Sequence, residues 1–77
     1  MDQTQQEFLQ AAKDELRQAY PRLTWDEFAD RVGIERRAFK TYRMPESSSD
    51  YRTMDKFKRK AVEDLLKKAR KKMKESA

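Results

Sequence analysis

The sequence predicts an all-α fold, a small four- to five-helix bundle with a long C-terminal helix. Apolar side chains recur at helical spacing, and no segment alternates as a half-buried strand does. The 77 residues include one glycine and two prolines, so few positions interrupt a helix. At this length we expect a single domain covering residues 1–77.

The first helix is expected to begin at Thr4 and to end before Pro21. In "TQQE" the Thr4 hydroxyl can accept from the backbone N–H of Glu7, and the Glu7 side chain can reach back, forming a capping box. Pro21 disfavours a helical conformation in the residue before it. Between these ends, one apolar face recurs at helical spacing: Phe8, Leu9, Ala12, Leu16, Ala19 and Tyr20.

The second and third helices are expected on either side of the only glycine. "TWDE" is a second capping box, with Thr24 as the cap and Glu27 as its partner. Gly33 suits the left-handed conformation that ends many helices. The third helix should cover about Glu35 to Arg43, because Pro45 cannot continue it. The buried side of the second helix is predicted to be Trp25, Phe28, Ala29 and Val32.

The last helix is expected after a loop, "MPESSSDYRT", with Thr53 as its cap. It should run from about Met54 to about Lys74, a length of roughly 30 Å at 1.5 Å per residue. Its end is rich in lysine, which suits either phosphate contacts or a solvated helix terminus. Its apolar stripe is predicted to be Met54, Phe57, Ala61, Val62, Leu65, Leu66, Ala69 and Met73.

Composition restricts the partners and the compartment. The net charge is +5, which favours a polyanion, with nucleic acid ahead of an acidic protein or membrane surface. Cysteine and histidine are absent, so we expect no disulfide, no metal and no cofactor. No apolar run reaches the ~18–20 residues of a membrane span, and the polar N-terminus is unlike a signal peptide. We therefore expect a cytoplasmic protein, nucleoid-associated when bound.

Residues 24–43 have the spacing of a helix-turn-helix. Two helices that cross at a large angle need a small residue at the crossing, and Ala29 is suitable. The turn needs a residue that tolerates positive φ, Gly33, and then an apolar residue that enters the core, Ile34. The following helix needs apolar residues for docking, and Phe39 and Tyr42 are three apart.

The segment "TWDEFADRVGIERRAFKTYR" resembles the helix-turn-helix of the lambda-repressor-like superfamily. The proline that follows it, and "DYRTM" before another helix, are similar to small phage and mobile-element regulators such as anti-CRISPR-associated repressors. The resemblance implies that double-stranded DNA is the partner and that the second helix of the motif enters the major groove. By position, the residues implied to contact bases are Glu35, Arg36, Arg37, Lys40 and Thr41.

Arg36 and Arg37 are the main specificity candidates, because arginine can bond guanine O6 and N7 together. One of them could hold a phosphate instead, or both could lie on a solvated helix face. The residues expected to contact phosphate are Thr24, Trp25, Arg43 and Arg52. Trp25 could instead belong to the core, and the two arginines of this set could pair with Glu46 or Asp50.

The length of the last helix suggests that part of it is left uncovered. On this view four apolar side chains would be exposed in a monomer and would form a two-fold dimer interface: Leu65, Leu66, Ala69 and Met73. The alternative is that the helix folds back over the first helix. A dimer would read two half-sites about 34 Å apart.

The function that best fits these features is a dimeric, sequence-specific transcriptional repressor that binds an inverted-repeat operator. Two alternatives remain: a small phage-type effector that binds an acidic host protein, and a nonspecific nucleic-acid binder. An enzyme is not expected, because there is no histidine, cysteine or glycine-rich phosphate loop. Neighbouring acids such as Asp14 and Glu15 point to different helix faces.

Overall fold

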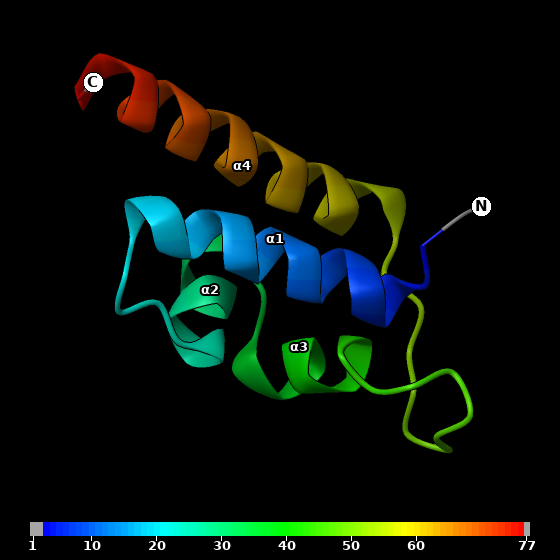
Figure 1. The fold of residues 1–77 in the computed structure, drawn as a ribbon. Coiled ribbons are helices and arrows are strands. Elements are labelled where there is room, and N and C mark those ends of the chain that lie inside the picture. The colour runs from blue at the N-terminus through cyan, green and yellow to red at the C-terminus, as the bar shows by residue number, and fades with distance from the viewer. Residues whose placement is uncertain (1–2, 77) are drawn as a thin grey trace.

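The computed structural model describes residues 3–76, and within that range the fold is entirely helical. Four helices follow in order: α1 (Gln5–Ala19), α2 (Trp25–Val32), α3 (Arg36–Tyr42) and α4 (Lys56–Ser76). In Figure 1, α1 and α4 lie side by side and run in the same direction, and α1 lies between α3 and most of α4. α2 packs against both α3 and α4.

The helix starts follow the capping residues closely. At α1 both capping-box bonds form: the Glu7 amide donates to the Thr4 hydroxyl (3.1 Å), and the Thr4 amide donates to the Glu7 carboxylate (3.4 Å). At α2 only half of the expected box forms, because the Glu27 amide donates to the Thr24 hydroxyl but the Glu27 carboxylate pairs with Arg31 at 3.0 Å. Arg31, one turn further along α2, thus holds the Glu27 carboxylate that would otherwise accept from the Thr24 amide.

Gly33 ends α2 in the left-handed conformation, with φ 73° and ψ 28°. The next residue closes the turn, because the Ile34 amide donates to the Ala29 carbonyl oxygen (2.9 Å). Ile34 is buried, as expected. α3 is shorter than the expected helix by one residue at each end, since Glu35 and Arg43 are its caps.

Substitutions at Gly33 are expected to cost stability through the backbone alone. A Cβ built at this position meets no atom within 4 Å, so there is no steric clash to add to the cost of positive φ. We expect Gly33→Ala to lower the free energy of unfolding by about 1–2 kcal/mol, Gly33→Asn by less and Gly33→Val by more. Urea unfolding of the three variants tests this order, and equal stabilities would contradict it.

The core is one cluster to which all four helices contribute. Phe28 and Phe39 are its largest fully buried side chains, and their ring centroids lie 5.0 Å apart. Trp25 extends this aromatic group at the edge of the core, 5.9 Å from Phe28 and 6.0 Å from Phe39. α3 is therefore anchored on α2 by aromatic packing, which leaves its opposite side facing solvent.

α4 is covered by its own chain, so the expectation that four of its apolar side chains are exposed is wrong for three of them. Leu65 and Leu66 are 8% exposed and Ala69 is 2% exposed, in the same cluster as Leu9 and Leu16 of α1. The alternative, in which the last helix lies over the first, is what the structure has. The physical reason is that α1 runs alongside most of α4, so the apolar side chains of the two helices cover one another.

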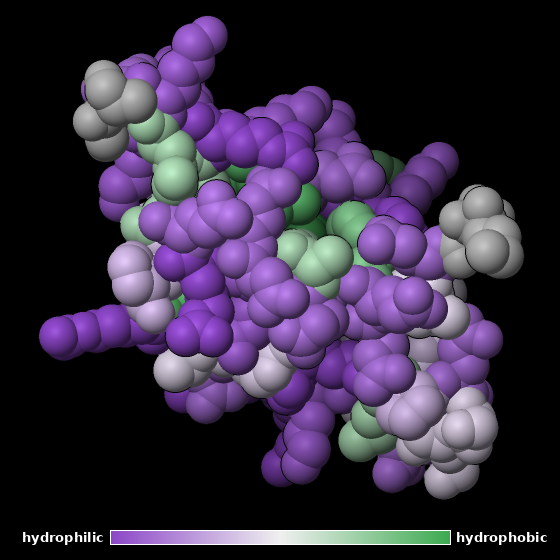
Figure 2. Space-filling model, in the orientation of Figure 1, coloured by the Kyte–Doolittle hydropathy of each residue, from purple (hydrophilic) through white to green (hydrophobic). Residues whose placement is uncertain are grey.

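Two side chains of the predicted apolar stripe do remain exposed. Phe57 is 75% exposed and Met73 is 40% exposed. Phe57 lies five residues before the buried Val62, which places it about 140° around the helix from that core position. Figure 2 shows hydrophilic residues over most of one face, with only small, separate hydrophobic areas. Phe57 and Met73 lie sixteen residues apart on α4, about 24 Å along the helix, so they do not make a continuous apolar surface.

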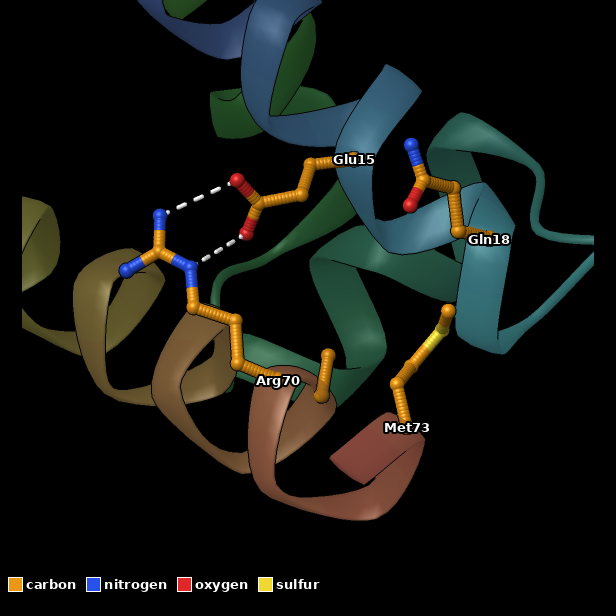
Figure 3. Close-up of a pocket in the computed structure, with 5 residues that line it drawn as sticks. Glu15, Gln18, Arg70 and Met73 are labelled. Atoms are coloured by element: carbon orange, nitrogen blue, oxygen red, sulfur yellow. Dashed lines mark hydrogen bonds and ion pairs between the residues drawn. The ribbon is translucent and has the colours of Figure 1, made fainter. Parts of the chain in front are cut away.

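Near its C-terminal end, α4 is joined to α1 by an exposed ion pair. Arg70 donates from Nε (2.8 Å) and Nη2 (3.0 Å) to the two carboxylate oxygens of Glu15. Figure 3 shows this pair beside Met73, whose side chain extends from α4 toward Gln18 of α1. Met73, one of the predicted dimer residues, thus lines a small groove of its own chain.

The start of α4 differs from the expected one. The cap is Asp55 rather than Thr53, because the Lys58 amide donates to the Asp55 carboxylate at 2.9 Å. The helix accordingly begins at Lys56, two residues later than expected. An aspartate is a better cap than a threonine, and a carboxylate also suits the positive end of the helix dipole.

The Asp55 cap is expected to make stability depend on pH. The hydrogen bond from the Lys58 amide lowers the pKa of Asp55 below its usual value. A depressed pKa in the folded state stabilises the protein above the unfolded pKa of about 3.9, and that contribution is lost as the pH falls through the folded value. We expect Asp55→Ala to be less stable than the wild type at neutral pH, with a difference that shrinks below about pH 4. Thr53→Ala is the matched control, and a larger effect from it would contradict the assignment.

A buried glutamine ties the loop between α3 and α4 to the start of α1. Gln5 is 8% exposed, and its Nε2 donates to the carbonyl oxygens of Tyr42 (2.9 Å) and Arg52 (2.8 Å). Its Oε1 accepts from the Met54 amide at 2.7 Å. One side chain thus pairs backbone groups at both ends of a loop.

Candidate nucleic-acid interface

The exposed side of α3 presents two cations that are free of ion pairs. Arg37 and Lys40 are exposed, and no carboxylate of residues 3–76 lies within ion-pair distance of either. They lie three apart on a helix, so they share a face. Two exposed cations without an ion-pair partner on one helix face form an arrangement that attracts an anion.

Arg36 differs from its neighbour because two carboxylates of α2 surround it. Its Nε and Nη2 donate to the two carboxylate oxygens of Asp30, at 3.1 and 2.6 Å. Its Nη1 is 3.9 Å from Asp26 Oδ2. The hydrogen bond from Arg36 lowers the pKa of Asp30, and the same bond raises the pKa of Arg36. The pair stays ionised throughout the ordinary pH range.

The other two predicted base contacts are less suited to that role. The Thr41 hydroxyl donates to the Ala38 carbonyl oxygen at 2.6 Å, and the residue is half-buried. Glu35 is exposed at the cap of α3, where its side chain makes no capping hydrogen bond. Within the predicted set, the cations Arg36, Arg37 and Lys40 are therefore the strongest group.

Three of the four predicted phosphate contacts lie together at the start of α2. The Arg43 guanidinium lies over the Trp25 ring, 4.5 Å from its centroid, and Thr24 immediately precedes that tryptophan. Arg43 Nε is buried and has no hydrogen-bond partner among the described residues. Burial is the main cause that lowers the pKa of Arg43, and the Asp26 carboxylate opposes the shift.

Lys13 of α1 adds a second cation to this group, and the sequence pattern did not identify it. Its Nζ lies 4.6 Å from the centroid of the Trp25 ring. Because Lys13 is twelve residues before Trp25, on another helix, no local spacing connects the two. The group of Lys13, Trp25 and Arg43 therefore gathers two positive charges around one indole, at the end of α3 where it meets α2.

Arg52 lies apart from that group, beside the end of α3. Its amide donates to the Thr41 carbonyl oxygen (3.4 Å), and its own carbonyl oxygen accepts from Gln5. In the described part of the chain, neither Arg43 nor Arg52 forms an ion pair with Glu46 or Asp50, the acids considered as alternatives. Both arginine head groups keep donors for another partner.

No group of three or more acidic, histidine or cysteine side chains among residues 3–76 could hold a metal ion. No helix in the same range is both long and apolar enough to span a bilayer. In comparisons with known proteins, no family model, no curated protein and no solved structure matches this chain.

Proposed function

We propose that this protein is a sequence-specific regulator that binds double-stranded DNA, with α2, the Gly33 turn and α3 acting as a helix-turn-helix. The observation that carries the proposal is the exposed face of α3, where Arg37 and Lys40 have no carboxylate partner among the described residues. A short helix fixed by its apolar side, with free cations on the other, suits insertion into the major groove.

The group at the start of α2 supplies the second part of the proposal. Lys13 and Arg43 hold two positive charges against Trp25. A DNA phosphate beside Lys13 and Arg43 would accept charge-assisted hydrogen bonds from both side chains, which lie at the C-terminal end of α3. Phosphate contacts on one side and base contacts on the other would fix the register of α3.

The regulatory step we propose is repression by occlusion of the promoter, as the resemblance to the lambda-repressor-like superfamily suggests. Two copies would bind an inverted repeat, with half-sites about 34 Å apart. The contact between copies would not involve Leu65, Leu66 or Ala69, because these side chains are buried within their own chain. It would have to use other surfaces.

Selection of binding sites from a random duplex pool tests the proposal. We expect one short sequence family to be enriched, arranged as an inverted repeat if two copies bind together. Affinity for that sequence should fall with salt, with a slope of roughly −0.9 for each phosphate contacted. A pool without enrichment, together with equal affinity for all duplexes, would contradict sequence-specific regulation.

A second candidate, nonspecific nucleic-acid binding, is favoured by the charge of α4. Residues 67–74 contain six lysines and arginines and no acid. This segment is the C-terminal part of α4, and in Figure 1 α1 lies between it and α3. Binding through it would therefore not require α3. Strong binding that survives loss of Arg37 and Lys40 would favour this candidate over the first.

A further inference from the structure

The two hydrogen bonds between Arg36 and Asp30 fix the direction in which the Arg36 guanidinium points. The two residues lie six apart, on either side of the Gly33 turn, and the pair joins the last turn of α2 to the first residue of α3. Both side chains are exposed, at 60% for Arg36 and 52% for Asp30. The contact is thus at the surface that α2 and α3 share, where a bound duplex would lie.

The pairing uses one edge of the guanidinium and leaves another free. Asp30 occupies the side edge, formed by Nε–H and one Nη2–H. A guanidinium has five N–H donors in a planar fork, so three remain. Two of these, on Nη1 and Nη2, form the end edge. Asp26 is near Nη1, but at 3.9 Å it is beyond hydrogen-bond distance and does not occupy that edge.

The free end edge has the geometry that guanine requires. Guanine presents two acceptors to the major groove, O6 and N7, and two parallel N–H groups of an arginine bond them together. A long, exposed arginine normally loses side-chain freedom when it makes such a contact, and that loss lowers affinity. An arginine already held by a carboxylate has lost much of that freedom in the free protein.

We propose that Asp30 is a positioning residue that sets Arg36 as a reader of guanine, and that this role rests on the DNA-binding function proposed above. Asp30 fixes the plane and direction of the guanidinium without contacting DNA itself. It also carries a negative charge near the phosphates, so it opposes binding to every sequence alike. Asp30 therefore reduces general affinity while it increases discrimination at one base pair.

These two effects separate in an experiment. The wild type is first used to select a sequence, and the base pair read by Arg36 is identified as the one whose preference is lost in Arg36→Ala. Binding of Asp30→Ala is then measured on the selected duplex and on duplexes substituted at that pair. We expect affinity for substituted duplexes to rise, while discrimination for guanine falls roughly tenfold. Replacing that guanine by 7-deazaguanine, which lacks N7, should weaken the wild type more than Asp30→Ala.

Asp26→Ala is the matched control. It removes the same charge from the same helix but breaks no hydrogen bond to Arg36. We expect it to raise affinity for all duplexes and to leave discrimination for guanine unchanged. If both variants retain discrimination, Asp30 acts only through its charge and the inference is overturned. If Arg36→Ala alters no base preference, the inference is overturned as well.

Absence of any selected sequence for the wild type overturns both the inference and the proposed function, whereas a selected sequence whose guanine preference survives in Asp30→Ala overturns the inference alone. The pairing itself is visible without DNA, through the nuclear magnetic resonance signal of the Arg36 Nε–H. Its exchange with water should be slower than that of Arg37 in the wild type, and should match Arg37 in Asp30→Ala.

Discussion

Arg37→Ala is expected to lower affinity for the selected duplex by roughly ten- to a hundredfold while leaving the free energy of unfolding unchanged. Arg37 is exposed and its side chain has no hydrogen-bond or ion-pair partner within residues 3–76, so its removal breaks no polar contact among them. Binding would lose either a bidentate base contact or a phosphate contact. Fluorescence anisotropy on the selected duplex gives the affinity, and urea unfolding gives the stability.

Two further variants show whether Arg37 acts through net charge alone, through a base contact or through a phosphate contact. Arg22→Ala removes the same charge from an exposed position that precedes α2. It should weaken binding much less than Arg37→Ala, and equal losses would show that only net charge matters. Arg37→Lys keeps the charge but loses the planar fork. Loss of base preference in Arg37→Lys indicates a base contact, whereas an unchanged preference with the affinity retained indicates a phosphate contact.

Gln5→Met is expected to be strongly destabilising, although it removes no apolar side chain of the core. It removes three hydrogen bonds and leaves the carbonyl oxygens of Tyr42 and Arg52 and the amide of Met54 without their partner. Because an orphaned buried polar group costs about 1–3 kcal/mol, we expect the free energy of unfolding to fall by about 3 kcal/mol in total. Chemical denaturation measures this, with the exposed neighbour substitution Gln6→Ala as the control.

Gln5→Glu separates the loss of hydrogen bonds from the loss of packing. An ionised carboxylate would face two carbonyl oxygens and could donate to neither, whereas a protonated carboxyl can donate to one. The variant should therefore gain stability, relative to wild type, as the pH is lowered toward its carboxyl pKa. A variant as stable as the wild type at neutral pH would show that the amide is not what holds the loop.

The sequence predicted the parts of the fold that depend on neighbouring residues. Thr4 and Thr24 cap their helices as expected, because a capping hydrogen bond spans three residues. Gly33 adopts the left-handed conformation for an equally local reason, since it lacks a Cβ. The same local periodicity identified Phe39 and Tyr42 as the anchors of α3, and both are buried.

The candidate site was predicted as residue types: base contacts on the helix after Gly33 and phosphate contacts at Thr24, Trp25, Arg43 and Arg52 around it. Helical spacing placed Arg36, Arg37 and Lys40 together on the exposed side of α3, and the structure confirms their exposure. It could not distinguish the paired arginine from the unpaired one. That distinction depends on Asp30, whose position relative to Arg36 is set by the angle of the Gly33 turn.

Local patterns in the sequence placed the starts of α1 and α2 and the buried faces of α1, α2 and α3, because caps, turns and periodicity act over a few residues. Tertiary structure alone decided the rest. It placed α4 along α1, which buried Leu65 and Leu66 that would otherwise need a partner. It brought Lys13 to Trp25 and Gln5 to Met54, across long separations in the chain. Such contacts depend on how whole helices pack, and no local pattern in the sequence encodes them.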